Sequence, residues 1–461
     1  MKKHFAKTFI AFFFIYSAGF SQVTFTVSKY SLNMYASSID LSDINNDGAT
    51  DIVSINWGIS GVVRILNDGT GSFGSAATST GITQPEHGAI VDYNGDGQVD
   101  VITCGPSLAS NAPSRMGVHK GNIAGTFSAA IIYTIAPAGE RIMRLLDVDQ
   151  DGNKDLVVAE YQATSLVGTP RVSVFILPNN GTILQPVHYP LSNFPTDMCI
   201  TDLNNDSYGD VVVTIGQTGQ IAVLLGDNTG TFGSPSYFTT CSNPTGVAAG
   251  DFNGDGKMDI VAGNANKQFA LMLGQGDGNF NPKTTINTTH VTELPVTADL
   301  NADGRTDIAF GTDSYSPGTG IAFVTGNGNG TFAAGVAVST GSYVNSLHVA
   351  DLNNDGMPDL IGNEAHQAVV LLNTSPNLVS VAKYQPDANF LKVLQNNKRL
   401  TLETSQASEL RLTDITGRTV CMAQLRAENE FTITLNDLTP GIYIATSSNA
   451  SGILQRKIII E

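Results

Sequence analysis

Short apolar runs separated by polar, glycine-rich turns make up most of this chain. The runs V-V-R-I-L (62–66), I-A-V-L-L (221–225) and I-A-F-V-T (321–325) are each followed by a glycine-rich turn and a phenylalanine. β-Branched residues in runs of this length, bounded by Gly, Asn and Asp, are typical of β-strands. Charged residues make up only 14% of the chain and there are 47 glycines, which favours strands and turns over helices. The pattern therefore predicts an all-β protein.

A nine-residue acidic segment recurs at a nearly constant interval. Successive copies begin 49, 55, 55, 49, 48 and 52 residues apart. A short apolar stretch such as Gly246–Gly250 precedes the segment, a β-branched strand follows it, and two further strands complete the interval. Four strands in about 50 residues make one propeller blade, so seven copies predict a seven-bladed β-propeller. We expect Val23–Leu32 to supply the fourth strand of the last blade, which removes an open sheet edge.

The nine-residue segment has the spacing of a calcium-binding loop. Calcium takes roughly six to eight oxygen ligands, and the segment offers side-chain oxygens at positions one, three, five and nine and a carbonyl at position seven. Flanking strands, and the lack of Glu at position twelve, distinguish it from an EF-hand. The predicted ligands of up to seven Ca²⁺ ions are Asp43, Asn45, Asp47, Asp51, Asp92, Asn94, Asp96, Asp100, Asp147, Asp149, Asp151, Asp155, Asp202, Asn204, Asp206, Asp210, Asp251, Asn253, Asp255, Asp259, Asp299, Asn301, Asp303, Asp307, Asp351, Asn353, Asp355 and Asp359.

The seven copies are not equivalent. The third has Asp149 where the others have Asn, so it carries one more charge and is expected to bind calcium most tightly. The fourth has Ser207 at position six, where the others have Gly. Because a positive φ is more costly for Ser than for Gly, this copy is expected to be the weakest site. One such segment alone resembles an ordinary Asx turn, but seven at the same phase of a repeat do not.

The net charge of −17 is concentrated in these segments. Positions one, three, five and nine hold 22 of the 41 acidic residues, so seven divalent ions would leave a charge of about −3. A chain this acidic excludes nucleic acid as the partner, because phosphates would be repelled.

The acidic segments and the glycine turns that end in Phe resemble the FG-GAP (VCBS-type) repeats of integrin α-subunit propellers. The resemblance covers residues 22–375. It implies that the loops bind calcium within a blade and stiffen it, while ligands meet a different face. The turn phenylalanines, which we expect to pack between blades, are Phe73, Phe127, Phe232, Phe280 and Phe332.

The two ends of the chain carry export signals. Residues 1–21 have a basic start and an apolar stretch, Phe9–Phe20, that is too short to span a bilayer, as in a secretory signal peptide. No transmembrane segment is expected after its cleavage. A linker is expected over 376–385. The alternating pattern of 386–461 then predicts a small C-terminal β-sandwich.

Three motifs in the C-terminal segment carry a second resemblance. Leu410–Arg418, Leu438–Tyr443 and Lys457 with the three isoleucines after it resemble a type IX secretion sorting domain of the Bacteroidota. The resemblance implies contact with the type IX secretion machinery. It also implies an exported protein on the outer cell surface or outside the cell.

The sequence leaves three functional hypotheses. No G-x-S-x-G or H-E-x-x-H motif is present. The first hypothesis is a calcium-stabilised binding or adhesion module for polysaccharide or a surface protein. The alternative is a calcium-dependent, lyase-like polysaccharide-degrading enzyme at the channel mouth, with Arg144 or His348 as base. The third is a structural component of the cell envelope. Polar residues expected to meet in the central channel are Asp40, Glu86, His87, Arg141, Arg144, Asp197, Glu293, Asn345 and His348.

Overall fold

The computed structural model describes two parts of the chain. The first is residues 23–375 except 34, 106–114, 135–140, 161–168, 228, 312–319 and 365. The second is residues 391–460 except 397–398, 405–407, 415–418, 426–429, 435–440 and 450–451. The predicted signal peptide, 1–21, and the predicted linker, 376–385, lie outside the described residues. Apart from one 3₁₀ turn, η1 (Gly216–Thr218), the elements are strands, which confirms the all-β prediction.

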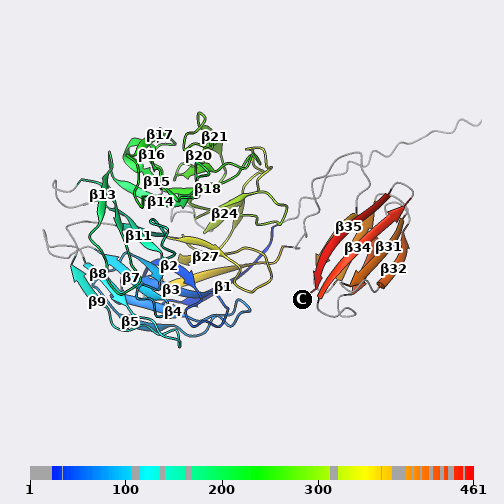
Figure 1. Cartoon of the computed structure of the whole chain (residues 1–461), viewed down its shortest axis with the longest axis horizontal. Coiled ribbons are helices and arrows are strands. Elements are labelled where there is room, and N and C mark those ends of the chain that lie inside the picture. Colours follow the sequence, from blue (N-terminus) through cyan, green and yellow to red (C-terminus); the bar gives the residue numbers. More distant parts are fainter. Residues whose placement is uncertain are drawn as a thin grey trace, which may run out of the picture.

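Seven four-stranded antiparallel sheets are arranged as the blades of a propeller (Figure 1). Blade 1 contains β2 (Ala36–Ser42), β3 (Asp51–Asn56), β4 (Gly61–Ile65) and β5 (Ala77–Thr80), and blade 2 contains β6 (His87–Val91), β7 (Asp100–Gly105), β8 (Arg115–His119) and β9 (Ile131–Thr134). Blade 3 contains β10 (Arg141–Leu146), β11 (Asp155–Glu160), β12 (Arg171–Phe175) and β13 (Val187–Pro190), and blade 4 contains β14 (Pro195–Thr201), β15 (Asp210–Ile215), β16 (Gln220–Leu224) and β17 (Ser236–Thr239).

The remaining three blades follow the same order from the innermost strand outward. Blade 5 contains β18 (Gly246–Gly250), β19 (Asp259–Gly263), β20 (Gln268–Met272) and β21 (Thr284–Asn287), and blade 6 contains β22 (Glu293–Ala298), β23 (Asp307–Gly311), β24 (Ile321–Val324) and β25 (Val336–Val338). Blade 7 contains β26 (Leu347–Ala350), β27 (Asp359–Glu364), β28 (Gln367–Asn373) and, as its outermost strand, β1 (Phe25–Ser31).

The N-terminal strand closes the ring, as the sequence predicts. Strand β1 pairs antiparallel with β28 from Phe25 opposite Asn373 to Ser31 opposite Gln367. The last blade therefore takes its fourth strand from the other end of the propeller. This pairing covers the edge of β28 that would otherwise remain open.

The core lies between the blades rather than within them. In β15, Val211 and Val213 pack with blade 3, whereas Val212 between them packs with Ile260 of blade 5. This alternation follows from the two-residue period of a strand, whose successive side chains point to opposite faces. The turn phenylalanines lie in the same interfaces, for example Phe232 against Tyr189 of the preceding blade with ring centroids 5.6 Å apart. Inter-blade packing of these phenylalanines is therefore confirmed.

The C-terminal part forms a separate set of strands. A three-stranded sheet contains β29 (Leu391–Asn396), β30 (Arg399–Thr404) and β33 (Glu430–Thr434). A four-stranded sheet contains β32 (Thr419–Leu425), β31 (Ser408–Asp414), β34 (Gly441–Asn449) and β35 (Gly452–Ile460). Both sheets are antiparallel.

Candidate functional site

Each acidic segment forms the connection between the first and second strands of its blade. The carboxylate at position one accepts hydrogen bonds from the loop's own backbone: in the first loop, Asp47 N–H and Gly48 N–H donate to the two oxygens of Asp43 at 3.1 and 2.8 Å. The position-six N–H makes this bond in all seven loops. The loops therefore curl around the side chain of their first residue.

The carboxylate at position nine is a buried latch between two parts of the blade. In the fourth loop, Asp210 Oδ2 accepts a hydrogen bond from Leu203 N–H, and Oδ1 accepts one from Gly226 N–H beyond the third strand, both at 2.8 Å. The same pair of bonds occurs in all seven loops. These residues, each at most 1% exposed, are Asp51, Asp100, Asp155, Asp210, Asp259, Asp307 and Asp359.

Two positions of the loop require left-handed backbone. Position six has a positive φ in every copy, including Ser207 at 71°, whereas the six glycines range from 79° to 91°. Position four is also left-handed, with Asn46 at 59° and Ala302 at 54°. An added Cβ at Gly48 would meet no atom within 4 Å, so glycine is favoured there by conformation and not by space. The sequence identified position six but not position four.

The third loop differs from the other six, and its differences are those expected of a cation-binding site. Oxygens of Asp147, Asp149 and Asp151 lie within 4.8 Å of one another. Asp147 Oδ1 is buried and, within the part of the chain that the structure describes, has no hydrogen-bond partner. In the other six loops this oxygen accepts the position-five N–H. A buried carboxylate oxygen without a donor is costly, and a hard cation would satisfy it.

The remaining loops reduce their internal repulsion with an amide. In four of them the position-three Asn donates to the position-five Asp, as Asn45 does to Asp47 at 2.8 Å. Asp149 cannot donate such a bond. The donor set of all seven loops is oxygen only, which fits calcium. The structure brings together the residues at positions one, three and five in each loop. The carboxylate at position nine lies beneath them, and each of its two oxygens already accepts one backbone N–H.

Burial and neighbouring negative charges raise the pKa of the carboxyl groups at position nine. Burial raises the pKa of Asp51, Asp155, Asp210 and Asp359 to about 6 and that of Asp307 to about 7. Repulsion from other carboxylates of the same loop raises these pKa values further, while the two backbone N–H donors oppose the shift. Each loop thus holds negative charge that a bound cation would neutralise.

The loops also connect neighbouring blades. Gln150 of the third loop donates to the carbonyl of Ser207 in the fourth loop at 3.3 Å. Asn354 of the seventh loop donates to the carbonyl of Gly69 in blade 1 at 3.4 Å, across the closure of the ring. Order within a loop is therefore transmitted to the next blade.

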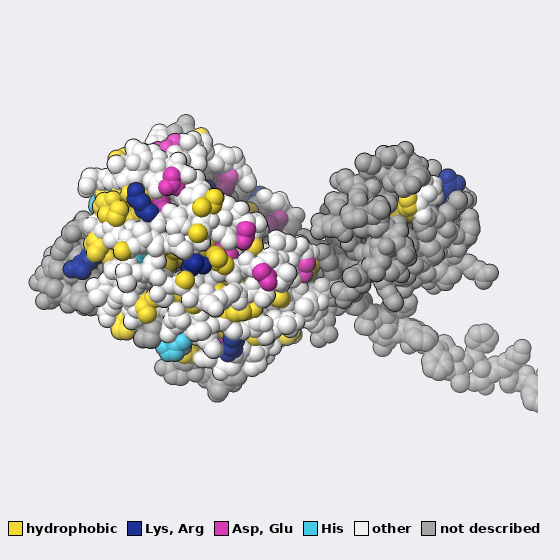
Figure 2. Space-filling view, turned by 90° about the horizontal axis from the view of Figure 1, so that it is seen from below, with side chains coloured by type: hydrophobic (Ala, Val, Ile, Leu, Met, Phe, Trp, Pro, Cys, Tyr) yellow, Lys and Arg dark blue, Asp and Glu magenta, His cyan; other side chains and the backbone are white. Residues whose placement is uncertain are grey.

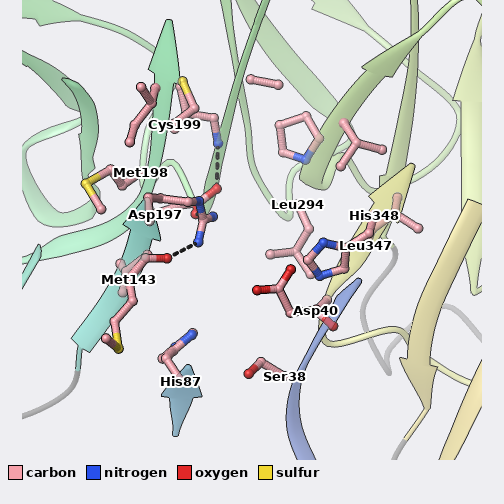
Figure 3. A pocket seen from close by; sticks show the side chains of 18 of the residues that line it. Ser38, Asp40, His87, Met143, Asp197, Met198, Cys199, Leu294, Leu347 and His348 are labelled. Carbon is pink, nitrogen blue, oxygen red and sulfur yellow. Dashed lines mark hydrogen bonds and ion pairs between the residues drawn. The ribbon is translucent and has the colours of Figure 1, made fainter. Parts of the chain in front are cut away.

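The seven innermost strands line a central channel with a cavity volume of 680 Å³. Asp40, His87, Arg144, Asp197 and His348 all lie in it, and Figure 3 shows Asp40, His87, Asp197 and His348 around one space. Arg144 donates to Asp197 Oδ1 at 3.0 Å. Asn345 also lines the channel, whereas Glu86 and Glu293 are not among the lining residues, and the side chain of Arg141 lies outside the described residues. The predicted convergence is correct for six of the nine residues.

Burial disfavours the charged forms of the histidines and carboxyl groups in the channel. Burial, and then Arg144, lower the pKa of His87 and His348 to about 4. Burial raises the pKa of Asp40 and Asp197, and Arg144 opposes both shifts. The Arg144 side chain is 42% exposed, so its charge is accessible to solvent, which weakens these effects. Arg144 is engaged with Asp197, so it is not positioned as a free base.

Trp57 and Tyr35, which no motif in the sequence predicts, lie on the face opposite the acidic loops. Trp57 follows β3 and Tyr35 precedes β2, and the side chains are 43% and 38% exposed. Tryptophan recurs in no other repeat, whereas Tyr343 stands eight residues before Asp351, as Tyr35 stands before Asp43. The available signal was that Trp57 is the chain's single tryptophan and directly follows a strand.

Comparisons with known proteins agree with this architecture. The family of FG-GAP-like repeats matches residues 43–103, 147–213, 202–262, 251–310 and 299–362, which together include all seven acidic loops. The secretion system C-terminal sorting domain matches residues 396–461. The comparison with curated proteins found no match. Within the described residues, no helix has the length and apolar character needed to cross a membrane.

Solved structures support the fold alone. The crystal structure of BBS1N in complex with ARL6DN, soaked with mercury, aligns with a TM-score of 0.52 at 10% identity, over 78% of this chain and 99% of that chain. The lead-soaked structure of the same complex aligns with a TM-score of 0.51 at 9% identity, over 76% and 96%. With its repeats matched over more than half its length, this chain belongs to the FG-GAP-like repeat family and carries a type IX secretion sorting domain that marks it as an exported protein.

Proposed function

We propose that this exported protein is a calcium-stabilised binding module. The supporting observation is the common hydrogen-bond geometry of the seven loops, together with the buried Oδ1 of Asp147, which has no hydrogen-bond partner among the described residues. Positions one, three and five and the carbonyl of position seven would hold the ion, with position nine supporting them from below. Calcium would supply positive charge where each loop concentrates carboxylates, and would thereby stiffen both the blade and its contact with the next.

The ligand is proposed to bind on the face opposite these loops. Every connection between first and second strands has eight residues, such as 43–50 and 202–209. Connections between second and third strands, on the other face, range from two residues (365–366) to ten (161–170). In repeat proteins, insertions gather on the binding face because the constant face maintains the scaffold.

The proposed ligand is a polysaccharide or a surface protein. Charged residues make up only 14% of the chain, and Figure 2 shows them scattered, without a large patch of one sign in that view. A surface with few charges suits recognition through shape, aromatic contacts and hydrogen bonds rather than through strong charge steering. A purely structural envelope role predicts no retention on any soluble or immobilised ligand.

Retention on immobilised ligands tests the proposal. The full chain is applied to insoluble polysaccharides and to immobilised outer-surface proteins, with calcium and with EGTA. Calcium-dependent retention without product release is expected. Release of unsaturated sugar ends would instead support the lyase, and the variants His348→Ala and Arg144→Ala would then test the two candidate bases. Equal retention with and without calcium would overturn the calcium dependence, and retention on none of the ligands would overturn the binding function.

A further inference from the structure

The central channel has two unlike walls. Its acidic, basic and imidazole side chains all come from the innermost strands of blades 7, 1, 2, 3 and 4, namely His348, Asp40, His87, Arg144 and Asp197. The innermost strands of blades 5 and 6 contribute uncharged residues instead, including Leu294 and Val296. A cavity of 680 Å³ is large enough for a small molecule, and apolar surface with a few convergent polar groups is typical of such a site.

The apolar wall contains a strained bulge. The pairing of β22 with β23 shifts register between Glu293 and Val296, so two residues of β22 oppose one of β23. Leu294, one of the two, has a φ of 46°, which is costly for a side chain of this size. The neighbouring blade makes room for it, since an added Cβ at Gly246 would lie 2.9 Å from Leu294 Cα. Bulges redirect side chains beside binding sites, and a strained one favours a role beyond packing.

On the polar wall, Arg144 and Asp197 neutralise each other. Arg144 donates to Asp197 Oδ1 at 3.0 Å and to the carbonyl of Met143 at 2.9 Å. Asp197 Oδ2 accepts the Val247 N–H at 3.0 Å. Both oxygens of this carboxylate are therefore occupied, and the guanidinium is held against it. The pair contributes no net charge to the channel.

Asp40 is the channel carboxylate without a counter-ion. Its Oδ1 accepts the Leu41 N–H at 2.9 Å, whereas among the described residues Oδ2 has no hydrogen-bond donor and neither oxygen has an ion-pair partner. Figure 3 shows this carboxylate directed into the channel. Burial raises the pKa of Asp40, and the Leu41 N–H and then Arg144 offset only part of the rise. A partly buried carboxylate is unfavourable unless a cation satisfies it.

Two imidazoles occupy the blades on either side of Asp40. His87 in blade 2 and His348 in blade 7 line the same channel. Burial, and then Arg144, lower the pKa of each to about 4, so both are neutral at pH 7 and each has a nitrogen that can accept a hydrogen bond. A carboxylate and neutral imidazoles are acceptors suited to the N–H groups of an ammonium ion. The two walls together match a molecule with an ammonium group and a short apolar body.

We propose that the channel binds a small organic amine, whose ammonium group pairs with Asp40 while its hydrocarbon chain lies against Leu294 and Val296. This site is additional to the polysaccharide or protein ligand proposed above and does not depend on it. A channel that holds only water, with its polar groups hydrating one another, is the competing outcome. A divalent cation bound directly by Asp40 and the imidazoles is a second.

The test uses hexylamine as the probe. It is titrated into the calcium-loaded full chain at neutral pH and physiological salt, and binding is followed by ligand-observed NMR. Hexanol has the same chain without the charge, and hexanoate reverses the charge. We expect saturable binding of hexylamine at one site and roughly tenfold weaker binding, or less, of the other two, because hydrogen bonds between charged groups are the stronger ones.

Two variants and one control locate the site. Asp40→Asn keeps the shape of the side chain and should weaken hexylamine binding roughly tenfold or more. Leu294→Ala removes apolar contact and should weaken it roughly threefold or more. The matched control is Asp68→Asn, because Asp68 is an exposed carboxylate in a turn outside the channel. It should leave the titration unchanged.

Equal binding of hexylamine and hexanol would contradict recognition of the charge. Absence of saturable binding, or equal affinity of Asp40→Asn and the unaltered chain, would overturn the site. Binding of zinc that Asp40→Asn abolishes, without binding of hexylamine, would assign the carboxylate to a metal instead. Equal melting temperatures establish that the variants are folded, and if Asp40→Asn does not fold, hexanol and Leu294→Ala decide. Retention on polysaccharides is measured separately, so failure of either proposal leaves the other standing.

Discussion

The two faces of this propeller are built on opposite rules. On one face, seven connections of eight residues repeat the same hydrogen bonds, down to the latch made by each position-nine Asp. On the other face, connections of two to ten residues share no such pattern, and one of them presents Trp57. Repetition marks what every blade needs in order to hold its neighbour. Departure from repetition marks what is particular to this protein, so stability and ligand binding should be separable by mutation.

The largest effect of a single substitution is expected at the position-nine latch. Asp307→Ala leaves the N–H groups of Leu300 and Gly326 buried without their acceptor. Losing two such bonds should lower the free energy of unfolding by about 2–5 kcal/mol, with or without calcium. Chemical denaturation with EGTA present measures it. The control is Asp303→Ala at position five of the same loop, which should matter mainly when calcium is present. Equal losses for the two variants in EGTA would contradict the latch.

The melting temperature should depend on pH differently with and without calcium. Without calcium, the folded pKa of the position-nine carboxyls lies above the unfolded value, so folding takes up protons as the pH falls from 8 to 6. The melting temperature in EGTA should therefore rise over this window. With saturating calcium it should stay level or fall, because protons compete with the ion. His87 and His348, whose folded pKa is depressed, act in the opposite direction below about pH 6.5. Parallel pH profiles with and without calcium would contradict this account.

The third and fourth loops should differ in their dependence on calcium. Asp147→Ala removes the unpartnered oxygen from the loop with four carboxylates, whereas Asp202→Ala alters the loop that contains Ser207. In calcium, Asp147→Ala should lower the melting temperature more, by about 3 °C or more if one site is worth about 2 kcal/mol. Differential scanning calorimetry decides the ranking. The reverse order would mean that charge number does not set loop affinity.

The smallest effect is expected from Ser207→Gly. Ser207 has a φ of 71°, which costs a non-glycine residue energy that Gly does not pay. The variant should gain about 0.5–1 kcal/mol, and Gly256→Ser, at the same position of the fifth loop, should lose a similar amount. An added Cβ at Gly256 meets no atom within 4 Å, so a steric clash does not contribute to the loss of stability. Loss of stability in Ser207→Gly would contradict the strain.

Features that repeat could be predicted from the sequence. The blade number, the strand Gly246–Gly250 and the pairing of β1 with β28 follow from one period read along the chain. The channel residues Asp40, Arg144 and His348 were found because they share one phase relative to their loops. Each of the seven copies shows the same sequence pattern, so features that are weak in one copy become recognisable when the copies are compared.

Features that depend on one contact between residues far apart in the sequence could not be predicted. The latch bond joins Asp210 in β15 to the N–H of Gly226 beyond β16, and a backbone donor leaves no trace in the sequence. Position nine was therefore interpreted only as a metal ligand. The pairing of β2 with β3 shifts its register between Ala36 and Ser38, and the repeat period does not reveal such a shift. The sorting motifs near Leu410 were identified by resemblance, without any repeat to support them.

The most direct measurement is the melting temperature of the full chain in calcium and in excess EGTA. If several loops bind the ion only in the folded state, mass action predicts a fall of more than about 10 °C on chelation, restored when calcium is added back. An unchanged melting temperature would contradict the central claim that calcium holds the repeated face of the propeller together.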